Sequence, residues 1–151
     1  MLEAWLDFHR TTLMLKCEGL DEETRKRRPV PTSALSLHGL VRHMAEVERG
    51  WFRRCLLRED VPFIFYDPEI GEDSDFMPLD TAEWESDLAA WLAACEAARD
   101  AAASKSLEDT GERRGEPVSL RWIYTHMIEE YARHNGHADL IRELLDGSVG
   151  W

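Results

Sequence analysis

Apolar residues recur at helical spacing in four parts of the chain, and this pattern predicts four helices. They span about residues 2–19, 37–57, 80–104 and 119–147. Ser36 and Ser119 directly precede the second and fourth of these segments, so each is expected to cap the helix that follows. No segment shows the alternating pattern that predicts a β-strand.

Irregular segments separate the predicted helices. Prolines within residues 29–33 forbid a helix there. Residues 58–79 contain three prolines and a glycine, and we expect this long connection to shape a pocket. Asp80, with Glu83 three residues later, predicts a capping box at the start of the third helix. The sequence therefore predicts an all-α four-helix bundle in one domain, residues 1–151, whose long connections allow a topology other than up-and-down.

The apolar stripe of the fourth helix has polar residues at its centre. A stripe of this kind faces a core, where Glu and His are costly to bury unless they are paired, hydrogen-bonded or bound to a metal. The pattern is typical of a site built between the helices of a bundle. In steps of three and four residues, the stripe consists of Leu120, Ile123, Met127, Glu130, His134, His137, Ile141 and Leu144.

Glu130 and His134 lie four residues apart, so their side chains project from the same face of the helix and can reach one ion. A third donor must come from another helix, and His43 lies on the apolar face of the second one. His43, Glu130 and His134 would form a three-ligand site with one open position, as in catalytic zinc sites. The alternative is a buried polar network that bridges the helices without a metal.

Three further histidines are candidates for roles around this site. His137 lies one turn beyond His134 and is a candidate fourth ligand, proton carrier or substrate contact. His126 precedes Glu130 by four residues and is a candidate hydrogen-bond partner of the ligands. His9 on the first helix is a candidate for facing the site.

Charge and cysteine content narrow the function classes. The formal net charge of −12 argues against non-specific nucleic-acid binding, which needs a basic surface. Cys17, Cys55 and Cys95 are few, odd in number and widely spaced, so we expect small buried side chains, no disulfides and a cytoplasmic location. We find no pattern of a signal peptide and no apolar run long enough for a membrane helix.

Two segments resemble the DinB/YfiT-like metal-dependent superfamily, in particular its actinobacterial-type branch of unknown function. They are SLHGLVRHMAEVERGWF at 36–52 and SLRWIYTHMIEEYARHNGHADLIRELLDG at 119–147. The resemblance implies a DinB/YfiT-like four-helix bundle with one long crossover connection, frequent homodimers and a divalent metal, with zinc as the first expectation and nickel as the second. His43 and His134 match ligand positions of that family. Glu130 stands where many relatives have histidine. The resulting set of two histidines and one glutamate resembles the ligand set of mycothiol-dependent maleylpyruvate isomerase.

The resemblance favours an enzyme that uses a low-molecular-weight thiol such as mycothiol, either an S-transferase or an isomerase acting on a small molecule. In such an enzyme His137 is the candidate catalytic residue that moves a proton. A metal-dependent hydrolase and a non-catalytic metal-binding stress or sensor protein are the alternatives. Six tryptophans exceed what one small core readily buries, so we expect a homodimer with Trp5, Trp84 or Trp151 at its interface.

Overall fold

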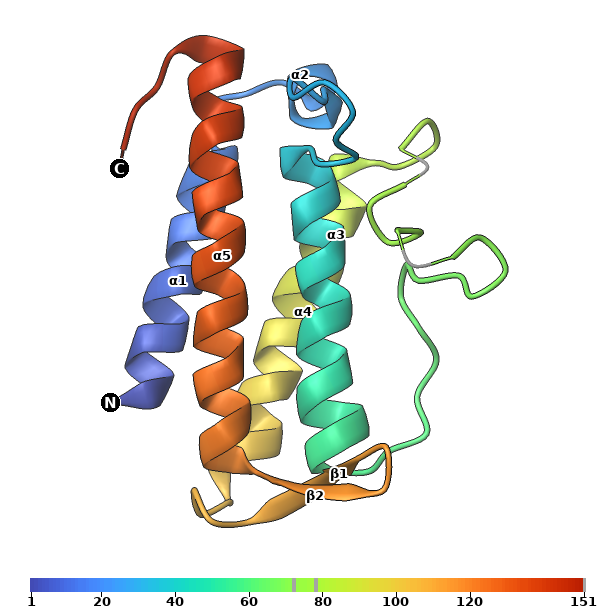
Figure 1. Ribbon diagram of the computed structural model, residues 1–151, viewed down its shortest axis with the longest axis vertical. Coiled ribbons are helices and arrows are strands. Elements are labelled where there is room, and N and C mark those ends of the chain that lie inside the picture. Colours follow the sequence, from blue (N-terminus) through green and yellow to red (C-terminus); the bar gives the residue numbers. More distant parts are fainter. Residues whose placement is uncertain (72, 78, 151) are drawn as a thin grey trace.

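The computed structural model describes residues 1–71, 73–77 and 79–150, and these residues are mostly helical. Long helices lie side by side (Figure 1), and a short helix and a hairpin lie at their ends. The elements in chain order are α1 (Leu2–Cys17), α2 (Glu22–Lys26), α3 (Leu37–Glu48), the π-helix η1 (Arg49–Leu56), α4 (Trp84–Ala103), β1 (Thr110–Arg113), β2 (Glu116–Ser119) and α5 (Leu120–Asp146).

The predicted helix ends at Ser36 and Ser119 are confirmed. The hydroxyl of Ser36 accepts a hydrogen bond from the backbone N–H of Gly39, and that of Ser119 accepts one from Trp122. At the other end of α5, Gly147 has a φ of 78°, a left-handed conformation that glycine adopts without steric cost.

Three expectations about the helices and strands are wrong. The third helix begins at Trp84 with Glu83 as its cap, because Asp80 lies in a turn closed by a hydrogen bond from Ala82 N–H to Leu79 C=O. The second helix changes from α to π geometry after Glu48. Residues 110–119, where no strand was expected, form an antiparallel hairpin.

The order of the helices requires a long crossover. α3 and α4 run in the same direction in Figure 1, while α1 and α5 run in the opposite one. Parallel neighbours cannot be joined by a tight turn, so the chain between Leu57 and Glu83 must return along the length of the helices. This connection passes beside α3, which carries His43.

A buried ion pair lies at the centre of the helix packing. The guanidinium of Arg10 on α1 donates two hydrogen bonds of 2.7 Å to the carboxylate of Glu48 on α3, and Glu48 is fully buried. The hydroxyl of Tyr131 on α5 donates to the same carboxylate at 2.7 Å and accepts a 2.9 Å hydrogen bond from the indole N–H of Trp91 on α4. Burial raises the pKa of Tyr131 well above its ordinary value, so the hydroxyl keeps its proton.

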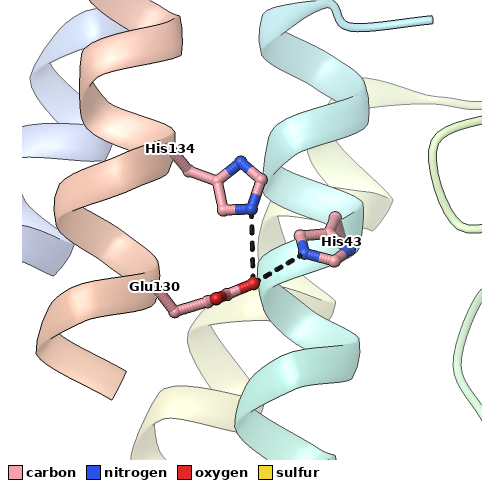
Figure 2. A group of neighbouring side chains, drawn as sticks. All are labelled: His43, Glu130 and His134. Carbon is pink, nitrogen blue, oxygen red and sulfur yellow. Dashed lines mark ion pairs between the residues drawn. The ribbon is translucent and has the colours of Figure 1, made fainter. Parts of the chain in front are cut away.

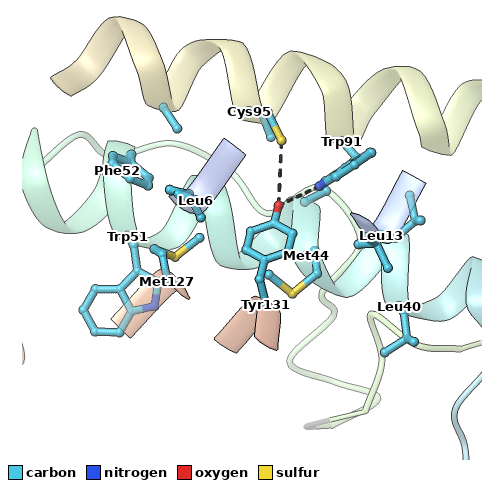
Figure 3. Close-up of a cluster of buried hydrophobic side chains, with 14 of the residues drawn as sticks. Leu6, Leu13, Leu40, Met44, Trp51, Phe52, Trp91, Cys95, Met127 and Tyr131 are labelled. Atoms are coloured by element: carbon cyan, nitrogen blue, oxygen red, sulfur yellow. Dashed lines mark hydrogen bonds between the residues drawn. The ribbon is translucent and has the colours of Figure 1, made fainter. Parts of the chain in front are cut away.

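Apolar side chains lie around Tyr131 and Trp91 (Figure 3). The largest fully buried ones come from all four long helices and include Leu6, Leu13, Leu40, Met44, Phe52, Met127 and Ile141. Polar groups are tolerated in such a core only when they bond to one another, and the contacts of Glu48 meet that condition.

No helix within the described residues is long and apolar enough to cross a membrane.

Arg10→Leu should lower the free energy of unfolding by about 3–5 kcal/mol, because the variant leaves the Glu48 carboxylate buried without its cation. Urea denaturation measures this change. Arg133→Leu is the matched control, since Arg133 pairs with Glu129 on the exposed side of α5 and its loss should cost less than about 1 kcal/mol. Equal destabilisation by the two substitutions would contradict a central role for the buried pair.

Candidate metal centre

The structure brings His43, Glu130 and His134 together. His43 projects from α3 toward Glu130 and His134, which lie one turn apart on α5 (Figure 2). One ligand atom of each residue lies within 4.8 Å of the others. A single carboxylate oxygen, Oε1 of Glu130, lies 3.5 Å from Nε2 of His43 and 3.4 Å from Nε2 of His134.

These side chains fit a divalent metal. Bonds of about 2.0–2.2 Å at tetrahedral angles place ligand atoms about 3.4 Å apart, close to the two separations found here. Nε2 of His43 is buried and has no hydrogen-bond partner among the described residues, because its 3.5 Å contact with Glu130 is too long. A buried nitrogen left unpaired is costly, and a metal ion would satisfy it. Two imidazoles and a carboxylate suit zinc and other first-row divalent ions.

Asp75 orients His43. Its Oδ2 lies 2.8 Å from Nδ1 of His43, and the ring of Phe76 stacks on the imidazole with a centroid distance of 4.5 Å. A carboxylate on Nδ1 fixes the tautomer that leaves Nε2 as a ligand atom, as is usual for metal-binding histidines. Asp75 was not predicted from the sequence, because it lies in the irregular connection, where no periodicity indicates which side chain turns inward.

The two histidines and their carboxylates form a strongly coupled electrostatic group. Burial on its own lowers the pKa of His43, but Asp75 and Glu130 outweigh burial and raise it to about 9. The imidazoles of His134 and His43 beside it hold the pKa of the Glu130 carboxyl well below its usual range. Without a metal, the carboxylates therefore stabilise a proton on His43, and a bound metal would replace that proton.

His137 lies next to His134. Their Nδ1 atoms are 3.3 Å apart, so His137 contacts the ring edge opposite the Nε2 that faces Glu130. His137 is half-buried, and it is not one of the three residues whose ligand atoms converge. This geometry favours an orienting contact with His134 over a position as fourth ligand.

His126 and His9 face other surroundings. His126 stacks on Trp122 with a centroid distance of 5.0 Å and lies 3.5 Å from the carboxylate of Glu129, the residue before the expected partner Glu130. The side-chain amide of Asn135 donates a 3.1 Å hydrogen bond to the backbone carbonyl oxygen of His9, and its nitrogen lies 3.4 Å from Nδ1 of the His9 ring.

The stripe predicted on α5 is only partly correct. Glu130 and His137 lie at its half-buried edge, and Leu144 is 58% exposed. The helix instead buries Tyr124, Tyr131, Asn135 and Ala138 beside the predicted apolar positions. The ligand residues thus border the core rather than occupy its middle.

The chain's own thiols are inaccessible. Cys17, Cys55 and Cys95 are free and at most 3% exposed. Burial raises the pKa of all three and takes that of Cys17 to about 12. None of them is a thiolate at neutral pH, so a sulfur nucleophile at this site would have to come from a separate molecule.

Sequence comparison identifies the family. The profile of the mycothiol-S-transferase family matches residues 1–147, and the chain belongs to this family, within the DinB/YfiT-like group. No curated protein and no solved structure shows significant similarity to the chain.

Asp75→Asn should weaken zinc binding by about 10–100-fold while His43, Glu130 and His134 remain in place, because an amide supports the His43 ring less strongly than a carboxylate. Competition with a chromogenic chelator measures the affinity. Asp73→Asn is the matched control, since Asp73 lies in the same segment but is exposed. Equal zinc affinity in wild type and Asp75→Asn would contradict the assigned role.

Proposed function

We propose that the chain is a divalent-metal-dependent S-transferase that joins the sulfur of mycothiol, or of a similar small thiol, to an electrophile. The observation that carries this proposal is the convergence of His43, Glu130 and His134 in a chain of the mycothiol-S-transferase family. The proposal includes a single domain with the DinB/YfiT-like four-helix bundle fold and a cytoplasmic location, where free thiols stay reduced.

His43, Glu130 and His134 would hold the metal, with zinc as the first candidate and nickel as the second. A bound metal lowers the pKa of a coordinated thiol, so the sulfur is available as a thiolate at neutral pH. Three protein donors leave one position for that sulfur. Asp75 and His137 hold the rings of His43 and His134 in the orientation that turns each Nε2 toward Glu130.

The proposed reaction is a substitution at a carbon atom of the electrophile, with the thiol sulfur as the nucleophile. The S–H bond of the thiol and the bond between carbon and its leaving group break, and an S–C bond forms. The leaving group departs with the electron pair of its bond, and a base takes the proton. We propose His137 for that role, with its Nε2 as the proton acceptor, because its Nδ1 faces His134.

The wild-type protein loaded with zinc should consume mycothiol in the presence of a reactive electrophile and contain one metal ion per chain. His134→Ala should lower both metal content and thiol consumption at least tenfold, because it removes one of three donors. Elemental analysis and a thiol assay measure the two quantities. A metal-loaded protein that consumes and binds no thiol, with hydrolysis of esters or amides instead, would replace the proposal with a hydrolase. The absence of any turnover would leave a metal-binding sensor.

His137→Gln should keep the metal and lower kcat by about 10²–10⁴-fold, the range typical of a lost proton carrier. Metal content and steady-state kinetics are measured on the same preparation. His126→Gln is the control, since His126 packs on Trp51 and Trp122 away from the ligands. Loss of metal in His137→Gln would make His137 a ligand, and unchanged kcat would exclude it from the chemistry.

We propose that the protein forms a homodimer through the outer face of α1. Trp5, Phe8 and Leu15 recur there at helical spacing and are 53%, 45% and 52% exposed. Trp84 is only 6% exposed and packs against His38 and Arg25, so it is a core residue rather than an interface residue. Trp151 lies outside the described residues.

Sedimentation equilibrium at micromolar concentration should give twice the chain mass of 17.5 kDa for the wild type. Trp5→Glu should shift the equilibrium toward the monomer, because a carboxylate would be desolvated at the interface. Leu92→Glu serves as the control, since Leu92 is similarly exposed at 47% but lies on α4. A wild-type species near 17.5 kDa alone would refute the dimer.

A further inference from the structure

A cavity lies beside the candidate metal centre. It has a volume of about 400 Å³, within the range of small-molecule sites, and lies between α3–η1, the crossover connection and the β1–β2 hairpin. Asp75 lines it and also contacts His43. Val47, another lining residue, follows His43 by four positions on α3, or about 6 Å along the helix. A small molecule in the cavity can therefore extend toward the ligand residues.

Three arginines form one wall of this cavity: Arg54 from η1, and Arg113 and Arg114 from the hairpin. Arg54 donates to the carbonyl of Val61, and its guanidinium lies 3.7 Å from the centre of the Phe63 ring, so its contacts within the described residues are with neutral groups. Within the described residues, neither Arg113 nor Arg114 forms an ion pair with a carboxylate. Such a group of cations is unusual in a chain with a net charge of −12, so it marks a local preference for anions.

The carboxylates that line the same cavity already have partners. Glu46 accepts hydrogen bonds from the backbone N–H groups of residues 64–66 in the crossover connection. Asp75 contacts His43, and Glu112 lies 3.6 Å from Arg58 outside the wall. Each of these carboxylates is thus held by other groups, while Arg113 and Arg114 have no carboxylate partner among the described residues.

The hairpin is held against η1, and one of its arginines, Arg113, is positioned by an aromatic ring. A Cβ atom at Gly111 would lie 2.1 Å from the carbonyl oxygen of Cys55, so the hairpin packs directly on the backbone of η1. The guanidinium of Arg113 lies 4.1 Å from the centre of the Trp51 ring, which keeps it over the cavity wall.

Arg114 has a strained backbone. Its φ is 53°, in the left-handed region that favours glycine or asparagine, and Gly115 follows with a φ of 84°. Arginine at this position lowers the stability of the turn relative to glycine. Strain of this kind is typical of residues kept for a functional contact.

We propose that the arginine wall binds the carboxylate of a negatively charged electrophile, the second substrate of thiol transfer. This inference rests on the proposed function. Guanidinium groups pair with carboxylates through two parallel hydrogen bonds, which fixes orientation as well as position. The carboxylate would lie between Arg113 and Arg114, and the rest of the electrophile would extend past Val47 toward His43.

The first test measures binding without any reaction. Isothermal titration calorimetry compares 3-nitrobenzoate with 3-nitrobenzamide, which has nearly the same shape but no charge. The benzoate should bind at least tenfold more tightly, and its affinity should fall as salt concentration rises. Equal affinities for the two compounds would overturn the inference. Because this assay needs no thiol and no turnover, its outcome is independent of the proposed function.

Two variants locate the anion site. Arg114→Gly should raise the melting temperature, because glycine relieves the positive φ, and should weaken benzoate binding at least fivefold. Arg113→Gln should weaken it similarly. Arg121→Gln is the matched control, since Arg121 is exposed and paired with Glu108, and it should bind like wild type. Unchanged benzoate affinity in Arg114→Gly would exclude the hairpin tip as the anion site. Because this substitution is expected to stabilise the fold, a loss of binding would not be explained by unfolding.

A third measurement identifies which substrate carries the carboxylate. Turnover is compared for 4-chloro-3-nitrobenzoate and its amide with mycothiol, and again with the charged thiol mercaptosuccinate. In each case an S–C bond replaces the C–Cl bond, and chloride and a proton leave. kcat/KM should be higher for the charged electrophile, and Arg114→Gly should remove the difference. A higher kcat/KM with mercaptosuccinate than with mycothiol, whichever electrophile is used, would overturn the assignment of the carboxylate to the electrophile. No turnover with intact benzoate binding would refute thiol transfer but support the anion site.

Discussion

The contact between Glu48 and its two partners determines how α1, α3 and α5 align. Arg10 neutralises the carboxylate from one side, and the Tyr131 hydroxyl donates to it from another. Tyr131 follows Glu130 directly, and Glu48 lies five residues after His43. The hydrogen bond from the Tyr131 hydroxyl to the Glu48 carboxylate fixes the rotation of α5 and its position along α3. It therefore also determines that Glu130 and His134 face His43. The candidate metal centre thus depends on a buried ion pair that is not part of it.

This dependence explains why the core keeps a full charge. Replacing a buried ion pair with apolar residues is often neutral or stabilising, so stability alone does not account for Arg10 and Glu48. A directional network restricts the helices to one register, whereas apolar packing tolerates several. Glu48 also lies where α3 passes into the π-helix η1, a local change of helical pitch that is common at functional sites.

The sequence predicted the long helices and the three converging residues because both depend on local spacing. Glu130 and His134 share a helix face because they are four residues apart, and His43 lies at the edge of the buried face of α3. Asp75, the hairpin and the π-helix were missed for a different reason. Asp75 reaches the site from an irregular segment, and the hairpin forms where Gly111 packs on the backbone of η1. The position of Asp75 and the hairpin therefore depend on contacts between distant parts of the chain. Tyr131 was missed because the apolar stripe was assigned to the adjacent residue, Glu130.

The parallel course of α3 and α4 has a consequence for how this architecture can diversify. A chain that must travel back along two parallel helices passes over the face where the ligand residues lie, so the crossover becomes a wall of the cavity through Phe63, Tyr66 and Asp75. The helices carry the candidate metal centre, while the crossover and the hairpin tip surround the space next to it. Substitutions, insertions or deletions in those two segments can change which molecules fit without disturbing the helix register. One set of candidate ligand residues can in this way be combined with cavities of different shape within one family.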